Sequence, residues 1–129
     1  MTVDLWMLVA STILFFLIYG LFQGFAVIQL VGLAGAAGNR DDIPLATGWM
    51  GRINRTVDNH SDNLIVFATL VIVAHITGNA NDVTAIGAIT FFAARVLHAG
   101  CYIAGFAWIR TLTWVACVVG MATILSQLF

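Results

Sequence analysis

The sequence predicts an all-α integral membrane protein, a four-helix transmembrane bundle that forms a single domain over residues 1–129. Its 129 residues are 61% hydrophobic and only 9% charged, whereas charged residues make up about 25% of a soluble domain. A bilayer core needs about 20 consecutive apolar residues per helix, and apolar segments of about that length recur along the chain. The net charge of −1 gives no field that would attract nucleic acid.

Four apolar segments are expected to cross the membrane. The first is too long for a cleaved signal peptide, and no basic residue precedes it. The second helix is expected to begin near Trp49, with a polar stretch before its apolar part. The predicted apolar spans are Leu5–Leu33, Asn63–Thr77, Val83–Trp108 and Thr111–Phe129. In the first span, Gly20 and Gly24 form a small-xxx-small pair, which predicts a close helix contact either within the bundle or between subunits.

Short connections predict antiparallel neighbours in one compact unit. They are Ala34–Gly48, Gly78–Asp82 and a turn at Trp108–Arg110. Four of the five arginines lie in or just after the first and third connections, and the second connection and both termini have no basic residue. The positive-inside rule therefore places those two connections in the cytoplasm and both termini outside it. These arginines are Arg40, Arg52, Arg55 and Arg110.

A polar stripe opens the second predicted helix. At about 100° per residue, Arg52, Arg55, Asn59 and Asp62 fall within an arc of about 80°. Charged and amide side chains at the end of a membrane helix indicate a functional site. The alternative for Arg52 and Arg55 is that their side chains extend to the membrane surface and bind nothing.

A second polar set, Arg95, His98 and Tyr102, shares one face of the third helix. An arginine in mid-span costs about 3 kcal/mol and needs a partner, for which Asp62 is the natural candidate. A purely structural Arg95–Asp62 pair is the alternative, although such a pair leaves donors free for a carboxylate. The two facing stripes predict a binding site for a small anionic ligand.

No metal site is expected. His60 and His75 lack a second ligand at metal-binding spacing. Cys101 and Cys117 form no CxxC motif, and we expect both to be buried thiols without a redox role.

Two motifs resemble those of the MAPEG family, small membrane proteins of eicosanoid and glutathione metabolism. The first is Arg55-x-x-x-Asn59-x-x-Asp62, and the second is Ala94-Arg95-x-x-His98-x-x-x-Tyr102, with Arg110 shortly after. The resemblance extends over essentially the whole chain. Further short matches are similar to the family's bacterial branch, which implies a bacterial inner membrane. They are Gly-Asn-Arg-Asp, Gly-Trp-x-Gly-Arg and Arg-Thr-Leu-x-Trp.

The resemblance implies a homotrimer that binds glutathione as a cosubstrate between subunits, in a site open to the cytoplasm. Arg110 matches the arginine that stabilises the thiolate in catalytic members. We include Arg52 and His98 in the expected binding site on their positions in the stripes. The residues that the resemblance places against glutathione are Arg55, Asn59 and Asp62 from the second helix and Arg95 and Tyr102 from the third.

The expected activity is that of a glutathione-dependent transferase or peroxidase acting on apolar electrophiles dissolved in the lipid. The chain departs from the active eicosanoid enzymes at Asp62 (usually Glu), at Asn63 and His98 (both Tyr), and at Ala34–Ala37, where it lacks an arginine. A non-catalytic trimeric module that binds an anionic lipid or a partner helix therefore stays open. The sequence does not identify the second substrate, since apolar pocket walls resemble lipid-facing helix.

Overall fold

The computed structural model describes residues 1–129 and contains helices and no strands. Four stretches are long and apolar enough to cross a membrane: Val3–Ala37, Gly48–Ile76, Asp82–Ala104 and Ala107–Leu125. The all-helical bundle predicted from composition is thereby confirmed. The elements are α1 (Val3–Phe16), the π-helical segment η1 (Leu17–Gln23), α2 (Gly24–Ala37), α3 (Gly48–Ile76), α4 (Asp82–Ala104) and α5 (Ala107–Leu125).

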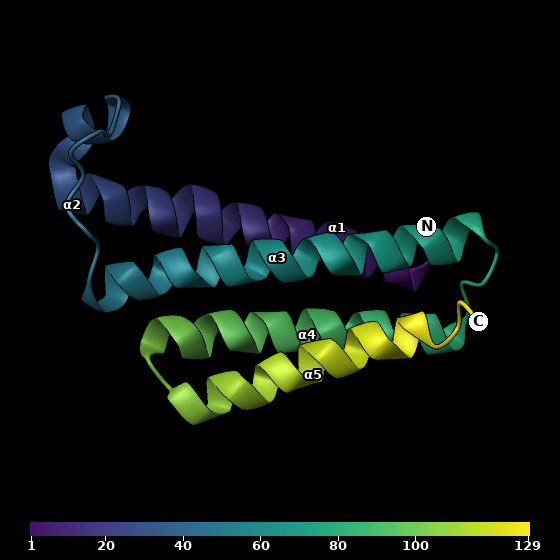
Figure 1. Cartoon of the computed structure of the whole chain (residues 1–129). Helices are drawn as coiled ribbons and strands as arrows, with labels where there is room; N and C mark the ends of the chain where they lie inside the picture. Colours follow the sequence, from purple (N-terminus) through teal and green to yellow (C-terminus); the bar gives the residue numbers. More distant parts are fainter.

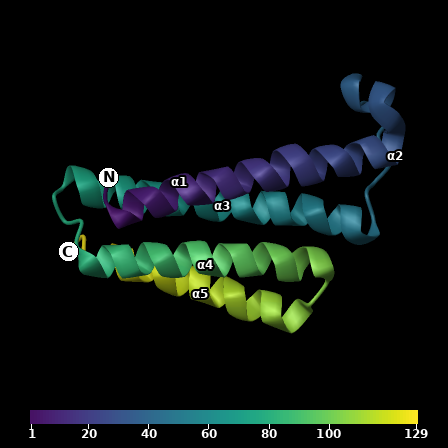
Figure 2. The ribbon, with the colours of Figure 1, turned by 180° about the vertical axis from the view of Figure 1, so that it is seen from behind.

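The helices form two antiparallel pairs. Figures 1 and 2 show α1 running beside α3, with α4 and α5 side by side next to them. Both termini lie at one end of the bundle, together with the α3–α4 connection. The α2–α3 and α4–α5 connections lie at the opposite end, which we call the arginine end because Arg40, Arg52, Arg55 and Arg110 are near these connections.

The first span is not one regular α-helix. Its middle, η1, is π-helical, a form that usually occurs as a short insertion and often at functional sites. Further on, Gly32 has φ 74° and ψ 171°, which breaks the helical path inside α2. A positive φ of this kind is readily adopted only by glycine. The end of α2 therefore turns away from the axis of α1 (Figure 1), and the following loop returns the chain to α3.

The third connection differs from the prediction. Instead of a turn at Trp108–Arg110, α4 ends at Ala104 and the chain reverses at Gly105, which has φ 93°. The backbone N–H groups of Gly105 and Phe106 both donate to the carbonyl of Cys101, so the last turn of α4 is capped. Arg110 consequently lies in the first turn of α5, where the helix fixes the direction of its side chain.

The α4–α5 contact is the closest helix pairing, and two glycines make it possible. A Cβ at Gly87 would lie 2.8 Å from the carbonyl oxygen of Gly120, and a Cβ at Gly120 would lie 2.7 Å from that of Gly87. The sequence predicted a close contact at Gly20 and Gly24 instead. Within this chain nothing packs closely there: a Cβ at Gly24 would have no neighbour within 4 Å.

A buried acid joins three helices at the end that carries the termini. Asp4 is 2% exposed, and its Oδ1 lies 3.1 Å from Nε2 of His75 on α3. Its Oδ2 accepts a hydrogen bond of 3.3 Å from Thr84 Oγ1 on α4. The carboxylate therefore ties the start of α1 to the end of α3 and the start of α4.

Candidate functional site

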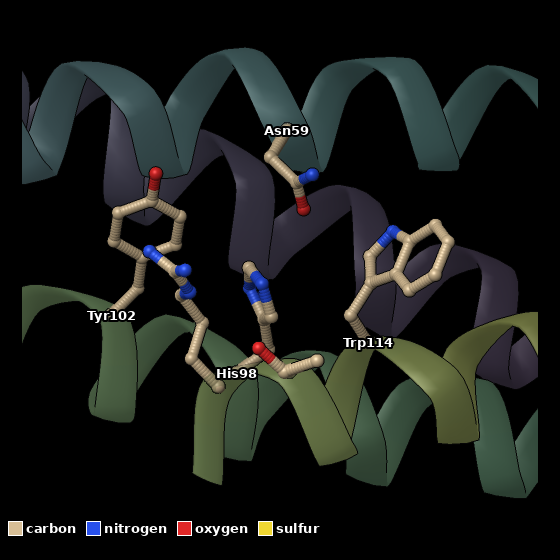
Figure 3. A pocket seen from close by; sticks show the side chains of 6 residues that line it. Asn59, His98, Tyr102 and Trp114 are labelled. Carbon is tan, nitrogen blue, oxygen red and sulfur yellow. The ribbon is translucent and has the colours of Figure 1, made fainter. Parts of the chain in front are cut away.

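A cavity of about 300 Å³ lies between α3, α4 and α5, toward the arginine end. Figure 3 shows Asn59 entering it from α3 and pointing toward His98 on α4, with Tyr102 to one side and Trp114 of α5 to the other. No carboxylate contributes to its wall. The lining residues are Asn59, His98, Tyr102, Arg110, Thr111 and Trp114.

Arg110 is held against the ring of Tyr102. Its guanidinium carbon lies 4.8 Å from the ring centroid, within the range of a cation–π interaction. The rings of Tyr102 and His98 in turn form a T-shaped pair with a centroid distance of 5.4 Å. Because one helical turn separates His98 from Tyr102, α4 presents both rings to the same cavity. These contacts hold the Arg110 guanidinium in position, although no acidic side chain is paired with it.

A smaller cavity of about 80 Å³ adjoins the first and shares Tyr102 and Arg110 with it. Arg52 and Arg55 line it from the start of α3. Arg52 is fixed by a hydrogen bond of 2.8 Å from its Nε to the carbonyl of Ile103. The guanidinium groups of Arg52, Arg55 and Arg110 therefore gather around one pair of connected cavities.

Arg95 lies behind this site and lines neither cavity. It is 0% exposed, and its Nη1 donates to Asn59 Oδ1 at 2.8 Å. Its Nε donates to Nδ1 of His60 at 3.3 Å. His60 must then carry its proton on Nε2, which donates to the carbonyl of Ser11 at 3.2 Å. A chain of hydrogen bonds thus runs from α4 through α3 to α1.

This series of hydrogen bonds determines the orientation of the Asn59 amide. The oxygen is occupied by Arg95, so Nδ2, which makes no other hydrogen bond within the chain, is the part left for a ligand. Asn59 is therefore a donor in the cavity, like Arg110 and like the indole N–H of Trp114. A wall of donors without an acid selects a ligand rich in acceptors, above all an anion.

The pair of Arg95 with Asp62 that the sequence suggested is not found, since the carboxylate is not within 4 Å of the guanidinium. Arg95 points between Asn59 and His60, and Asp62 lies about 160° around α3 from His60. Asp62 is instead exposed on the outer side of α3, as are Arg55 and Asp58. The predicted stripe on α3 thus divides: Asn59 lines the main cavity and Arg52 and Arg55 line the adjoining one, whereas Asp62 lines neither.

Comparison with known proteins supplies the family. A sequence model of the MAPEG family matches residues 5–129, nearly the whole chain. The chain belongs to the MAPEG family. No curated protein and no solved structure matches it. MAPEG is a membrane family, and together with the four apolar helices this identifies an integral, multi-pass membrane protein.

Three residues of this MAPEG protein's polar centre were not singled out from the sequence. Thr111 and Trp114 line the main cavity from α5. Trp114 follows Thr111 by three residues and Arg110 by four, and side chains at these spacings are neighbours on a helix, which is the signal that could have found them. His60 was set aside as a metal ligand, and its role as the partner of Arg95 depends on the packing of α3 against α4.

The polar centre of the MAPEG bundle is not fully satisfied. Three buried polar atoms have no hydrogen-bond partner: Ser11 Oγ, Arg95 Nη2 and His98 Nδ1. A buried group left without a partner costs about 1–3 kcal/mol, so unpaired groups of this kind are uncommon in native proteins and call for an explanation. Because His98 also lines the cavity, this unsatisfied layer is continuous with the candidate binding site.

Proposed function

We propose that this MAPEG protein is a glutathione-dependent membrane transferase or peroxidase that conjugates or reduces apolar electrophiles dissolved in the lipid. The observation that carries the proposal is the acid-free cavity with Arg110 fixed over Tyr102. Family membership is consistent with a glutathione-related membrane function. The cavity chemistry supports glutathione, a small peptide with two carboxylates, one ammonium group and a thiol.

The donor groups suit the two carboxylates. In this proposal Asn59, through its Nδ2, binds one of them in the main cavity, and Arg52 and Arg55 bind the other from the adjoining cavity. Arg95 fixes the orientation of Asn59 from behind. His98 and Tyr102 form the wall between these groups. Positioning of this kind lowers the entropy that the chemical step must lose.

Arg110 is the proposed catalytic residue, which stabilises the thiolate of glutathione. A free thiol has a pKa of about 8.5, so only a few per cent is ionised at neutral pH. One arginine about 4 Å away contributes up to about 4 kcal/mol at an effective dielectric of 20, equivalent to up to about three pKa units. Half of that effect would already make the thiolate abundant at neutral pH, and no metal is required.

The ammonium group of glutathione needs an acid, which the cavity lacks. Asp58 and Asp62 lie on the exposed side of α3, and Asp62 is about 21 Å along the helix from its start. A carboxylate at that depth is costly against lipid. We infer that another copy covers this side of α3 in a homotrimer, so that Asp62 of one subunit completes the glutathione site with a neighbour.

The absence of an acid from the cavity also favours a second candidate, a non-catalytic module that binds the anionic headgroup of a lipid. Such a ligand needs donors and no acid. The two candidates differ in the thiol. Only the enzyme converts a bound thiol to its thiolate, so the ultraviolet absorbance of the thiolate separates them.

Calorimetric titration of the detergent-solubilised protein with glutathione tests the proposal, together with thiolate absorbance of the complex. We expect binding in the millimolar range or tighter and a thiolate signal that Arg110→Ala abolishes. Arg40→Ala is the matched control, since it removes one positive charge at the same end but outside the cavity. Absence of binding at millimolar glutathione, or a thiolate signal unchanged in Arg110→Ala, would overturn the proposal.

A further inference from the structure

A second pair of adjoining cavities lies on another side of α3, at the point where the first span is π-helical. A polar cavity of about 330 Å³ is lined by residues of η1 and α2, by Asn54 of α3 and by Arg40 of the loop. An apolar cavity of about 260 Å³ adjoins it and shares Val27 and Asn54. Asn54 lies about 140° around α3 from Asn59, so this region is separate from the Arg110 cavity.

The polar cavity, which we call the polar compartment, is open because two residues of its wall are glycines, which have no side chain. Gly20 and Gly24 both line it. A Cβ at Gly24 would meet nothing within 4 Å, and one at Gly20 would approach only the ring of Phe16, at 3.9 Å. The two glycines are therefore not required by packing within the chain. They leave a groove that side chains of ordinary size would fill.

Hydrogen-bonding groups of the polar compartment are oriented but not saturated. Gln23 Nε2 donates to Asn54 Oδ1 at 3.1 Å, so the Nδ2 donors of Asn54 remain free. The hydroxyl of Tyr19 has no hydrogen-bond partner within the chain. Unpaired donors beside a cavity favour a ligand with an acceptor group.

Arg40 supplies the charge. It adopts φ 64°, an unusual backbone conformation for a residue other than glycine. Its Nε donates to the carbonyl of Ala36 at 2.9 Å, and both Nη atoms are free of hydrogen bonds. Asp41 and Asp42 are its neighbours, yet neither carboxylate is within 4 Å of the guanidinium. The Arg40 guanidinium therefore lines the polar compartment without an acidic partner.

The apolar compartment has a different chemistry. Seven of its nine lining residues are hydrophobic. Val27 and Leu30 line it from α2, Pro44 from the following loop and Met50 from α3. A hydrocarbon chain that enters from the lipid would find apolar walls here, directly beside the donors around Asn54. The two compartments together match the two halves of an amphiphile.

We propose that the groove formed by η1, the Arg40 loop and the start of α3 binds a single-chain amphiphile with a carboxylate or phosphate head. The head lies at Arg40 and Asn54, and the chain lies between α2 and the segment Ile43–Met50. Asp41 and Asp42 disfavour heads of higher negative charge. The site is independent of glutathione and of the residues proposed to bind it.

Photocrosslinking tests the proposal. The probe is a long-chain fatty acid with a diazirine in its chain, added to the detergent-solubilised protein and mapped by peptide mass spectrometry. We expect crosslinks concentrated within residues 26–50. Oleate should compete, whereas oleyl alcohol should compete at least about threefold less, because it lacks the charge that Arg40 binds. Acetate and inorganic phosphate distinguish a free anion from a lipid acid, and neither should compete at millimolar concentration.

Gly24→Leu should abolish the crosslinks by filling the groove, and Arg40→Ala should weaken binding about three- to tenfold. Gly100→Leu is the matched control, since Gly100 also lies in a helix with nothing within 4 Å of its Cβ. The midpoint of thermal unfolding of Gly24→Leu in detergent should match that of the wild type, which shows that the variant is folded. Crosslinks spread over all helices, equal competition by the alcohol, or competition by acetate would each overturn the proposal, as would unchanged labelling of Gly24→Leu.

Discussion

Arg95 Nη1 donates a hydrogen bond of 2.8 Å to Asn59 Oδ1, linking the buried middle of α4 to the wall of the cavity. The guanidinium does not line the cavity itself. It acts through Asn59, whose amide it turns so that a donor is available to the cavity. A charge buried among the helices therefore fixes the orientation of a side chain in the candidate site.

Asn59→Asp tests this relationship. The carboxylate keeps the shape of the side chain and gives the buried guanidinium a counter-charge. The hydrogen bond with the guanidinium becomes an ion pair, whose Coulomb attraction exceeds that of the charge–dipole contact it replaces, so the free energy of unfolding in detergent should rise by about 0.5–1 kcal/mol. Glutathione affinity should fall at least tenfold, because a donor of the cavity becomes an anion. Chemical unfolding and calorimetry measure the two effects.

Asn63→Asp is the matched control for that variant. Asn63 lies one turn further along α3 and lines neither cavity at the arginine end. Its glutathione affinity should stay within about twofold of wild type, since it lies outside the site. Equal losses in the two variants would mean that charge alone, and not the orientation of Asn59, determines binding.

Tyr102 should matter to Arg110 through its ring. Tyr102→Phe retains the ring under the guanidinium, whereas Tyr102→Leu removes an interaction worth about 0.5–1 kcal/mol. The fraction of bound glutathione present as thiolate should therefore be unchanged in the Phe variant and reduced in the Leu variant. Ultraviolet difference absorbance measures it. A loss in Tyr102→Phe as large as in Tyr102→Leu would assign the effect to the hydroxyl.

Gly120→Ala should disrupt the α4–α5 pair. The new Cβ would lie 2.7 Å from the carbonyl oxygen of Gly87 and 2.8 Å from the backbone nitrogen of Phe91, so the helices must separate. Overpacking of this kind costs about 1–3 kcal/mol, which should appear as a lower midpoint of thermal unfolding. Gly100→Ala has open space around its Cβ and should gain about 0.5–1 kcal/mol from helix propensity. Equal midpoints for the two variants would contradict the contact.

Asp4→Asn should loosen the end that carries the termini. The substitution removes the contact with His75 and keeps an acceptor for Thr84. Loss of a buried hydrogen bond to a charged group predicts a decrease of about 1.5–3 kcal/mol in the free energy of unfolding. Asp41→Asn, in an exposed loop, should change it by less than about 0.5 kcal/mol. Glutathione affinity should not change in either variant, because both residues lie outside the proposed glutathione site.

Composition and spacing along the chain were sufficient for the coarse structure. Hydropathy adds up residue by residue, so the number of spans and the helical class follow from the sequence alone, as does the family. The shared face of His98 and Tyr102 also follows from spacing, because the helical period is fixed. What depends on rotation between helices did not follow, and the Gly87–Gly120 contact was therefore not predicted.

The sequence by itself determined that Arg95 must have a partner, since an isolated charge in a membrane helix is too costly. Only the tertiary structure decided that the partners are Asn59 and His60. The same holds for Arg110, which Gly105 places in a helix facing Tyr102. The physical reason is that the cost of desolvating a charge depends only on the residue and its segment. A hydrogen bond between helices depends on how the two helices are turned toward each other.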